Sequence, residues 1–156
     1  MINKKCQQPD FKHICNEGTI HRLPKVNHPV YYGGPILTNV VGVLHSTDFI
    51  LTSTNTLTED KVGFTLDRKM LEVIAKGQGP KNMLITLGMA NWTTGQLEEE
   101  LEHPRNPAMS WLIMDYDEKF VFGQLDEDKP DDLWESCVSQ AIRNKTQEIT
   151  SKIFKD

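Results

Sequence analysis

Three side chains that together can activate a hydroxyl nucleophile lie within four positions of the chain: His45, Ser46 and Asp48. A Ser-His-Asp triad works only when the three groups converge beside an oxyanion hole. His45 and Ser46 are neighbours in an apolar, β-branched run, so on a strand their side chains would point to opposite faces. We therefore expect structural hydrogen bonds from these residues to a neighbouring loop, and no catalytic residue is assigned.

The side chains that bind metals do not follow a metal-binding spacing. They are three cysteines and three N-terminal histidines: Cys6, Cys15, Cys137, His13, His21 and His28. Zinc sites show close pairs such as CxxC or HxxxH, and a cysteine nucleophile needs an adjacent base. Cys137 lies on an apolar helical stripe, where a small hydrophobic residue is the better account. We predict no metal, no cofactor and a reducing compartment.

Two glycine-rich stretches could form phosphate loops, but neither has the required pattern. GQGP (77–80) lacks the GK[ST] ending of a P-loop, and its proline removes a backbone donor. YYGGP (31–35) is not GxGxxG. For YYGGP two readings stay open. Gly33 and Gly34 end a strand and redirect the chain before Pro35, or the tyrosines and glycines line a small-ligand pocket.

The pocket reading is an alternative function, a small-ligand-binding protein or enzyme. Aromatic and polar groups beside glycine turns can form the wall of such a site. The residues that would line it are Tyr31, Tyr32, Gly33, Gly34, His45, Ser46, Trp92 and Gln96.

An acidic helix is expected around WTTGQLEEELE (92–102). Its glutamates would suit a metal or a basic partner, or they form a solvated face. Trp92 and Trp111 are either exposed binding anchors or core residues with one wet edge.

Composition excludes several broad classes. The 156 residues carry a net charge of −5, with 38% hydrophobic residues. Extensive phosphate binding needs a basic face, so there is no strong nucleic-acid signal. No apolar run is long enough to span a membrane, and MINKKCQQPDFKH has no signal-peptide core. We expect a cytoplasmic protein with an unknown protein partner or self-association.

The apolar runs predict strands at 30–32, 40–45, 49–54, 62–66, 82–87 and 110–114, with 55–61 as a polar turn. Asp67 should cap a helix to Lys76 that Gly77 ends. TTGQ (93–96) matches a capping box, and a last helix should follow Pro130. Residues 1–28 should be loop or short irregular strand. The fold class is α+β, with about three helices packed on a mixed sheet.

Several blocks in order resemble the AlgH/YqgE family of small bacterial proteins: VYYGGP (30–35), GVLHS (42–46), LEVIAKGQGP (71–80), LITLGMANWTTGQLEEEL (84–101) and SWLIMD (110–115). The LGMANWTTGQLEEEL block is the strongest. The N-terminal part is shorter than the family's, and PDFKHICNEG (9–18) resembles a contracted remnant of it. Three segments follow: a variable, partly disordered 1–28, a single domain at 29–143 and a polar tail at 144–156.

The resemblance implies a mixed α+β domain of unusual topology, with N-terminal strands missing or contracted. It implies a cytoplasmic, non-enzymatic role in gene regulation, after the proposed role in regulating alginate production for which AlgH is named. The family's biochemical activity is not established, so no catalytic residues carry over. Loss of N-terminal strands should leave an exposed sheet edge, which favours self-association.

Overall fold

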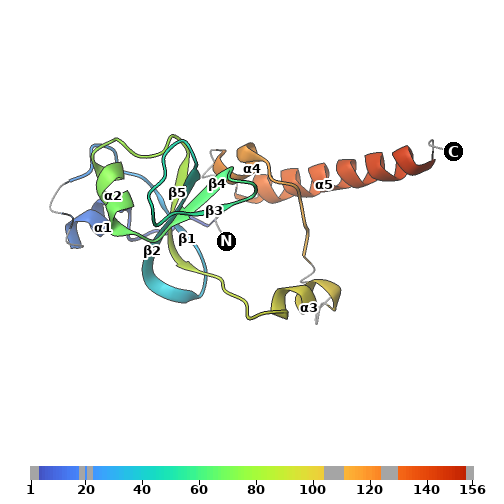
Figure 1. The fold of residues 1–156 in the computed structure, drawn as a ribbon, viewed down its shortest axis with the longest axis horizontal. Helices are drawn as coiled ribbons and strands as arrows, with labels where there is room; N and C mark the ends of the chain where they lie inside the picture. Colours follow the sequence, from blue (N-terminus) through green and yellow to red (C-terminus); the bar gives the residue numbers. More distant parts are fainter. Residues whose placement is uncertain (1–3, 18–19, 21–22, 104–110, 124–129, 154–156) are drawn as a thin grey trace. The chain divides into compact units, whose positions relative to one another are not determined.

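The computed structural model describes residues 4–17, 20, 23–103, 111–123 and 130–153. The chain forms two compact units, Met1–Asn91 (unit 1) and Trp92–Asp156 (unit 2). Among the described residues, unit 1 contains the sheet and two helices, and unit 2 contains three helices (Figure 1). The α+β class with a mixed sheet is thus confirmed. The sequence boundaries at 28/29 and 143/144 stay predictions.

The sheet of unit 1 has five strands in the order β1-β5-β2-β4-β3. They span Val30–Tyr32 (β1), Ile36–Ser46 (β2), Asn55–Leu57 (β3), Val62–Thr65 (β4) and Met83–Met89 (β5). β1 is parallel to β5, while β2 is antiparallel to both β5 and β4. The last strand in sequence therefore lies between the first two.

This order forces the short link between β1 and β2 to cross the end of β5. The crossing is made by Gly33 and Gly34 against the backbone of Gly88 and Met89. A Cβ on Gly33 would lie 2.1 Å from the Gly88 carbonyl oxygen, and one on Gly34 would lie 2.2 Å from the Met89 carbonyl carbon. Gly88 itself has φ +73, which favours glycine. The glycines are required because one backbone passes directly over another.

Two helices cover one face of the sheet, α1 (Phe11–Glu17) and α2 (Arg68–Ala75) (Figure 1). The core between them joins side chains from both helices and three strands: Phe11, Cys15, Val30, Val43, Met70, Leu71, Ile74, Ala75 and Ile85. The predicted limits of α2 are confirmed. The Asp67 carboxylate accepts from Lys69 N, and Gly77 has φ +72 just after the helix.

Residues 1–28 were expected to be loop or irregular strand, and α1 shows this was wrong for 11–17. Phe11 and Cys15 are spaced one turn apart and both are buried. The helix is held at its start by the Phe11 N–H, which donates to the His28 carbonyl at 3.2 Å. A seven-residue helix is too short to be stable alone, so burial of this apolar face stabilises it.

The N-terminal segment also protects the β1 edge of the sheet. Lys5 forms an antiparallel bridge with Tyr31. Cys6 N donates to the Val30 carbonyl and Tyr32 N donates to the Lys4 carbonyl, each at 2.7 Å. The expected exposed edge is therefore wrong for β1, because residues 4–6 take the place of a neighbouring strand. β3 is the opposite edge, and its three residues are exposed.

Two neighbouring segments near β3 have the reverse of their predicted structures. Residues 49–54 were expected to form a strand, but they make turns. Thr54 Oγ1 accepts from Leu51 N at 2.9 Å, a local side-chain bond that competes with strand pairing. Asn55–Leu57, expected as part of a polar turn, is instead strand β3.

Unit 2 contains α3 (Gln96–Glu102), α4 (Glu118–Phe122) and α5 (Pro130–Ile153). Part of the predicted capping box forms, because Thr93 N donates to Gln96 Oε1, but the helix begins only at Gln96. The predicted strand at 110–114 is wrong for Trp111–Met114, which belong to no strand or helix; Ser110 lies outside the described residues. No helix in the described ranges is long and apolar enough to cross a membrane.

Candidate functional site

His45 lies inside unit 1, with none of its surface exposed. Its register partner across the sheet is Gly63. The imidazole lies over that residue, because a Cβ there would be 2.5 Å from His45 Cε1. His45 Nδ1 is 2.9 Å from the Ser46 carbonyl oxygen, and His45 Nε2 is 2.9 Å from Thr65 Oγ1. Both ring nitrogens therefore have partners within the fold.

The direction of each hydrogen bond around His45 can be assigned, because the groups at the two ends of the network, the Ser46 carbonyl and the Leu51 N–H, have fixed roles. A carbonyl only accepts, so His45 Nδ1 carries the proton that bonds Ser46 O. In the neutral ring Nε2 then accepts from the Thr65 hydroxyl. Thr65 Oγ1 accepts in turn from Thr54 Oγ1, 2.8 Å away, and Thr54 accepts from Leu51 N–H. This chain of hydrogen bonds joins β2 and β4 to the 49–54 turns, and His45 is buried within it.

Ser46 points away from His45, as the strand alternation predicted. Its hydroxyl donates to Asp48 and accepts from Asn82 N at 3.1 Å. The hydrogen bond from the Ser46 hydroxyl holds the pKa of Asp48 below its usual value, with Lys81 N–H adding to the effect. Ser46 thus fastens the 46–48 turn to the 80–82 turn. The predicted structural hydrogen bond to a neighbouring loop is confirmed for Ser46. The His45 ring bonds to strand residues instead, Ser46 in β2 and Thr65 in β4.

The YYGGP stretch belongs mainly to the sheet. Tyr31 and Tyr32 are consecutive strand residues, so their side chains point to opposite faces. Gly33 N donates to the Leu87 carbonyl at 2.8 Å. The prediction that Gly33 and Gly34 end a strand and redirect the chain is confirmed by the crossing described above. That these residues, with His45 and Ser46, line a ligand pocket stays a prediction.

The remaining two predicted residues, Trp92 and Gln96, meet in unit 2 on one carboxylate. Trp92 Nε1 donates to Glu100 Oε2 at 3.4 Å, and Gln96 Nε2 donates to Glu100 Oε1 at 3.2 Å. Trp92 also meets Trp111 edge to face, with ring centroids 5.8 Å apart and planes at 67°. Glu100 is thus the residue that organises the WTTGQLEEEL block, and its role was not predicted.

Trp111, one of the two paired indoles, is also the first residue of an exposed apolar segment. Trp111 is 49% exposed, Leu112 41% and Ile113 74%. They precede Asp115 and Asp117 in an extended stretch outside any strand or helix. Sequence reasoning predicted a strand here, and it left Trp111 open between an exposed anchor and a core residue. The exposed reading of Trp111 is the signal that could have found this segment, since Trp111 is 49% exposed.

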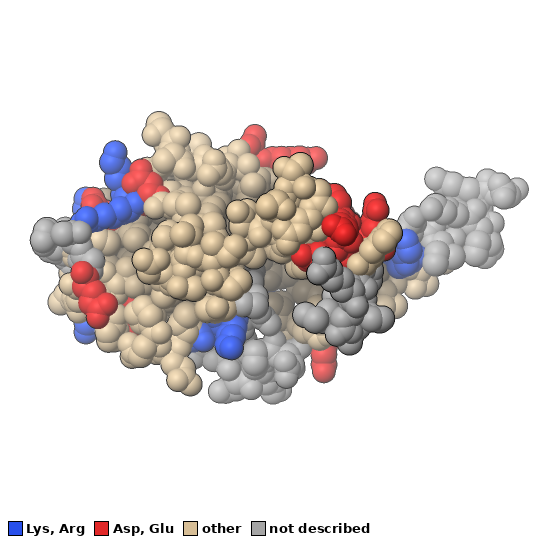
Figure 2. All heavy atoms as spheres, turned by 90° about the horizontal axis from the view of Figure 1, so that it is seen from below, with Lys and Arg blue, Asp and Glu red and all other residues tan. Residues whose placement is uncertain are grey.

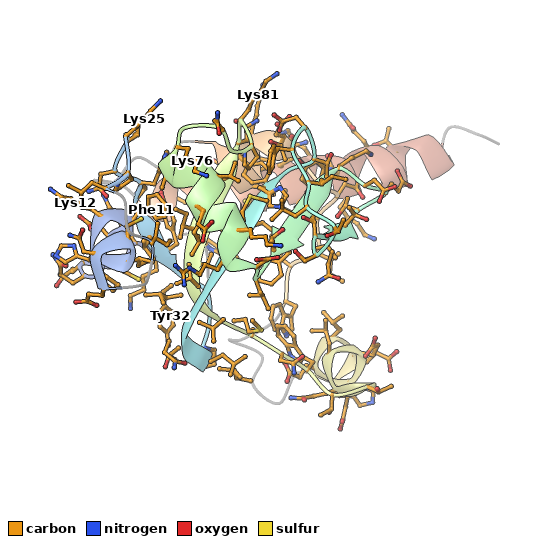
Figure 3. The ribbon with its side chains drawn as sticks, turned by 60° about the vertical axis from the view of Figure 1, so that its left-hand side comes forward. Phe11, Lys12, Lys25, Tyr32, Lys76 and Lys81 are labelled. Atoms are coloured by element: carbon orange, nitrogen blue, oxygen red, sulfur yellow. The ribbon has the colours of Figure 1, made fainter. Side chains whose placement is uncertain are left out.

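The two units have opposite charge. Unit 1 has ten Lys and Arg against seven Asp and Glu, a net charge of +3, and unit 2 has seven against fifteen, a net charge of −8. Lys12, Lys25 and Lys81 extend outward from unit 1 (Figure 3). In unit 2 carboxylates gather over α3 (Figure 2). No lysine or arginine in the described ranges pairs with an α3 carboxylate.

Unit 2 also has a groove beside α4 and α5, with a volume of about 590 Å³. It is lined by Phe120, Glu135, Ser136, Ser139 and Arg143. None of these residues was predicted as a site residue, because they are spread over two helices and match no motif. The Arg143 guanidinium donates to Gln140 Oε1 at 2.9 Å.

The described residues contain no group of three His, Cys, Asp or Glu side chains that could hold a metal ion. The cysteines are free thiols, and burial raises the pKa of Cys6, Cys15 and Cys137. A raised pKa disfavours the thiolate, which is the reactive form.

Comparison with known proteins found a matching family model and several similar sequences. The family model described as AlgH-like matches residues 1–145. A UPF0301 protein of Bradyrhizobium sp. is 34% identical over 84% of this chain, and one of Cereibacter sphaeroides is 34% identical over 83%. The matches cover 62% and 68% of those relatives, respectively. Another, from Rickettsia akari, is 38% identical over 70% of this chain and 53% of its own length.

The fold has a solved counterpart. The solution structure of the AlgH protein from Pseudomonas aeruginosa matches 90% of this chain and 69% of that chain, with a TM-score of 0.69 and 27% identity. The chain spans 44–62% of the length of the first curated relatives it matches.

Proposed function

The chain belongs to the AlgH-like family, and from this membership we propose that it is a non-enzymatic binding protein of the cytoplasm. It acts in the regulation of gene expression through a protein partner. The contact is made by the extended segment Trp111–Ile113 of unit 2.

One observation carries this proposal. The three consecutive large apolar residues of Trp111–Ile113 are exposed to water. Contiguous exposed apolar surface is typical of protein–protein contact sites, and tryptophan is enriched among the residues that dominate binding energy. The candidate polar groups of unit 1 make their hydrogen bonds within the fold instead, as His45 and Ser46 do.

Charge supports a protein partner over direct contact with DNA. Unit 2, which presents the exposed segment, has a net charge of −8. Phosphate backbones repel such a surface, since nucleic-acid affinity comes chiefly from lysine and arginine. Regulation then operates through a protein that itself contacts the transcription machinery or the nucleic acid.

The proposal is tested in cells that lack the gene and are complemented with variants of the full chain. Ile113→Asp places a charge in the exposed segment, and because Ile113 is exposed, thermal stability should not change. The matched control is Ile50→Asp, since Ile50 of unit 1 is also more than half exposed. The readout is whether a variant restores the transcript levels that change when the gene is deleted. We expect Ile113→Asp to fail to restore them and Ile50→Asp to restore them. Full complementation by Ile113→Asp would contradict the proposal.

A further inference from the structure

The partner's chemistry can be inferred from the surface around Trp111, and this inference rests on the proposed function. We propose that this surface binds a basic, extended segment of the partner that alternates arginine with apolar residues. The acidic–aromatic surface is defined as Trp92, Trp111, Leu112, Ile113 and the α3 carboxylates.

The first step of the inference concerns the aromatic groups. The edge-to-face contact with Trp92 fixes the Trp111 indole, while 49% of Trp111 stays exposed. Trp92 is held in turn by its bond to Glu100. An indole held in place from one side presents its remaining surface to a ligand at little entropic cost. A cationic side chain over such a ring gains cation–π attraction, and arginine does this more often than lysine.

The second step concerns charge. α3 (QLEEELE) carries four glutamates on seven residues. Glu100 is engaged with Trp92 and Gln96, while Glu98, Glu99 and Glu102 pair with no lysine or arginine of the described ranges. Asp115 and Asp117 follow the apolar segment, and Asp117 also caps α4 through Lys119 N. An excess of carboxylates next to exposed apolar groups complements a basic partner in both charge and hydrophobicity.

The third step concerns the form of the partner. Trp111–Met114 is backbone outside any helix or strand of the chain. Trp111 and Ile113 have high strand propensity, and we infer that the segment pairs with an extended peptide through main-chain hydrogen bonds, as the exposed edge of a sheet does. An extended partner presents alternate side chains to the same face. One set would then meet Leu112 or Ile113 while the other meets the carboxylates.

The inference is tested first with synthetic peptides and the full chain. The probe is a fluorescein-labelled ten-residue peptide of alternating arginine and leucine, compared with one in which glutamate replaces arginine. Fluorescence anisotropy should show binding of the arginine peptide alone. Trp111→Ala should weaken this binding about fivefold or more. The double variant Glu99→Gln with Glu102→Gln should weaken it and reduce its dependence on salt.

The control for charge is the double variant Glu17→Gln with Glu59→Gln, which removes the same charge from exposed positions of unit 1. It should leave the affinity unchanged. Equal loss in this control would show that net charge alone drives binding, and would overturn the inference. Binding that is indifferent to Trp111→Ala would overturn it too.

The second experiment separates failure of the inference from failure of the proposed function. A photo-crosslinking amino acid replaces Ile113 in the full chain in cells, and the crosslinked peptide of the partner is sequenced. A partner segment with arginine or lysine beside apolar residues supports the inference. A partner segment without basic residues, or a second copy of this chain, overturns the inference and leaves a binding function standing. No crosslink, together with normal regulation by Ile113→Asp, would reject both.

Discussion

The Nε2 atom of His45 lies 2.9 Å from Thr65 Oγ1, and both residues are buried on the core face of the sheet. The two side chains come from neighbouring strands, β2 and β4, and the contact continues through Thr54 into the 49–54 turns. A histidine that could have been a catalytic base is thus part of a structural network. Its geometry leads to the first prediction.

Removal of the Thr65 hydroxyl should destabilise unit 1. Thr65→Val keeps the side-chain shape but leaves His45 Nε2 and Thr54 Oγ1 without their partner. A buried polar group that loses its hydrogen bond costs about 1–3 kcal/mol. Denaturant unfolding followed by circular dichroism should show this loss, while Thr65→Ser, which keeps the hydroxyl, should lose less. Equal stability of the valine and wild-type proteins would show that the network contributes nothing.

Alanine at the strand crossing should be much more damaging than alanine at a helix end. Gly33→Ala and Gly34→Ala place a Cβ about 2 Å from the β5 backbone, which cannot move aside as a side chain can. We expect a loss above about 3 kcal/mol, or no folded protein. The control is Gly77→Ala, where φ is +72 but the nearest atom is Lys25 Cδ at 3.4 Å. It should lose only about 1–2 kcal/mol. Similar losses at all three positions would contradict the crossing.

The pKa of Asp48 should lie below the ordinary aspartate value of about 3.9, and Ser46→Ala should raise it. The main cause of the lowered pKa is the hydrogen bond from the Ser46 hydroxyl. Because the pKa is lowered in the folded state, the carboxylate stabilises the fold above pH 3.9 or so, and this contribution is lost as the pH falls through the folded value. Carbon-13 NMR titration measures the shift. Ser53→Ala, which removes a bond to Asp67 instead, should leave Asp48 unchanged.

The β3–β4 turn should be stabilised by glycine. Thr58, Glu59 and Asp60 have φ values of 54, 52 and 62, a left-handed conformation that costs most residues about 1 kcal/mol. Asp60→Gly should therefore raise the unfolding midpoint slightly, because at most about 0.5 kcal/mol remains after the entropy of glycine is counted. Lys61→Gly, at a position without positive φ, should lower it. A midpoint lowered by Asp60→Gly would show that the Asp60 side chain contributes more than its strain costs.

Predictions from the sequence succeeded where the determining interactions are local. Helix α2 begins at the residue after Asp67 and ends before Gly77, and both signals lie within one turn of the helix ends. β4 and the centre of β2 were identified from their β-branched runs. The family blocks also led to the correct α+β class.

Predictions failed where a segment's state depends on a distant partner. α1 exists because Phe11 and Cys15 enter a core that includes Val30 and Ile85. Trp111–Met114 have the composition of a strand, yet strand formation requires a neighbour, and the segment has no strand pairing. Residues 49–54 turn because Thr54 binds Leu51 N and Thr65 together.

The sequence by itself determined the family, the mixed α+β class, the absence of a recognisable catalytic motif and the acidity of the WTTGQLEEEL block, since each depends on residue type and order alone. Only the tertiary structure decided what those residues do. It showed that Gly33 and Gly34 cross over β5, because β5 comes from a distant part of the chain. It showed that His45 is buried and bonded to Thr65, while Trp111 stays exposed. Burial depends on which elements pack against a side chain, and these elements can be far apart in the sequence.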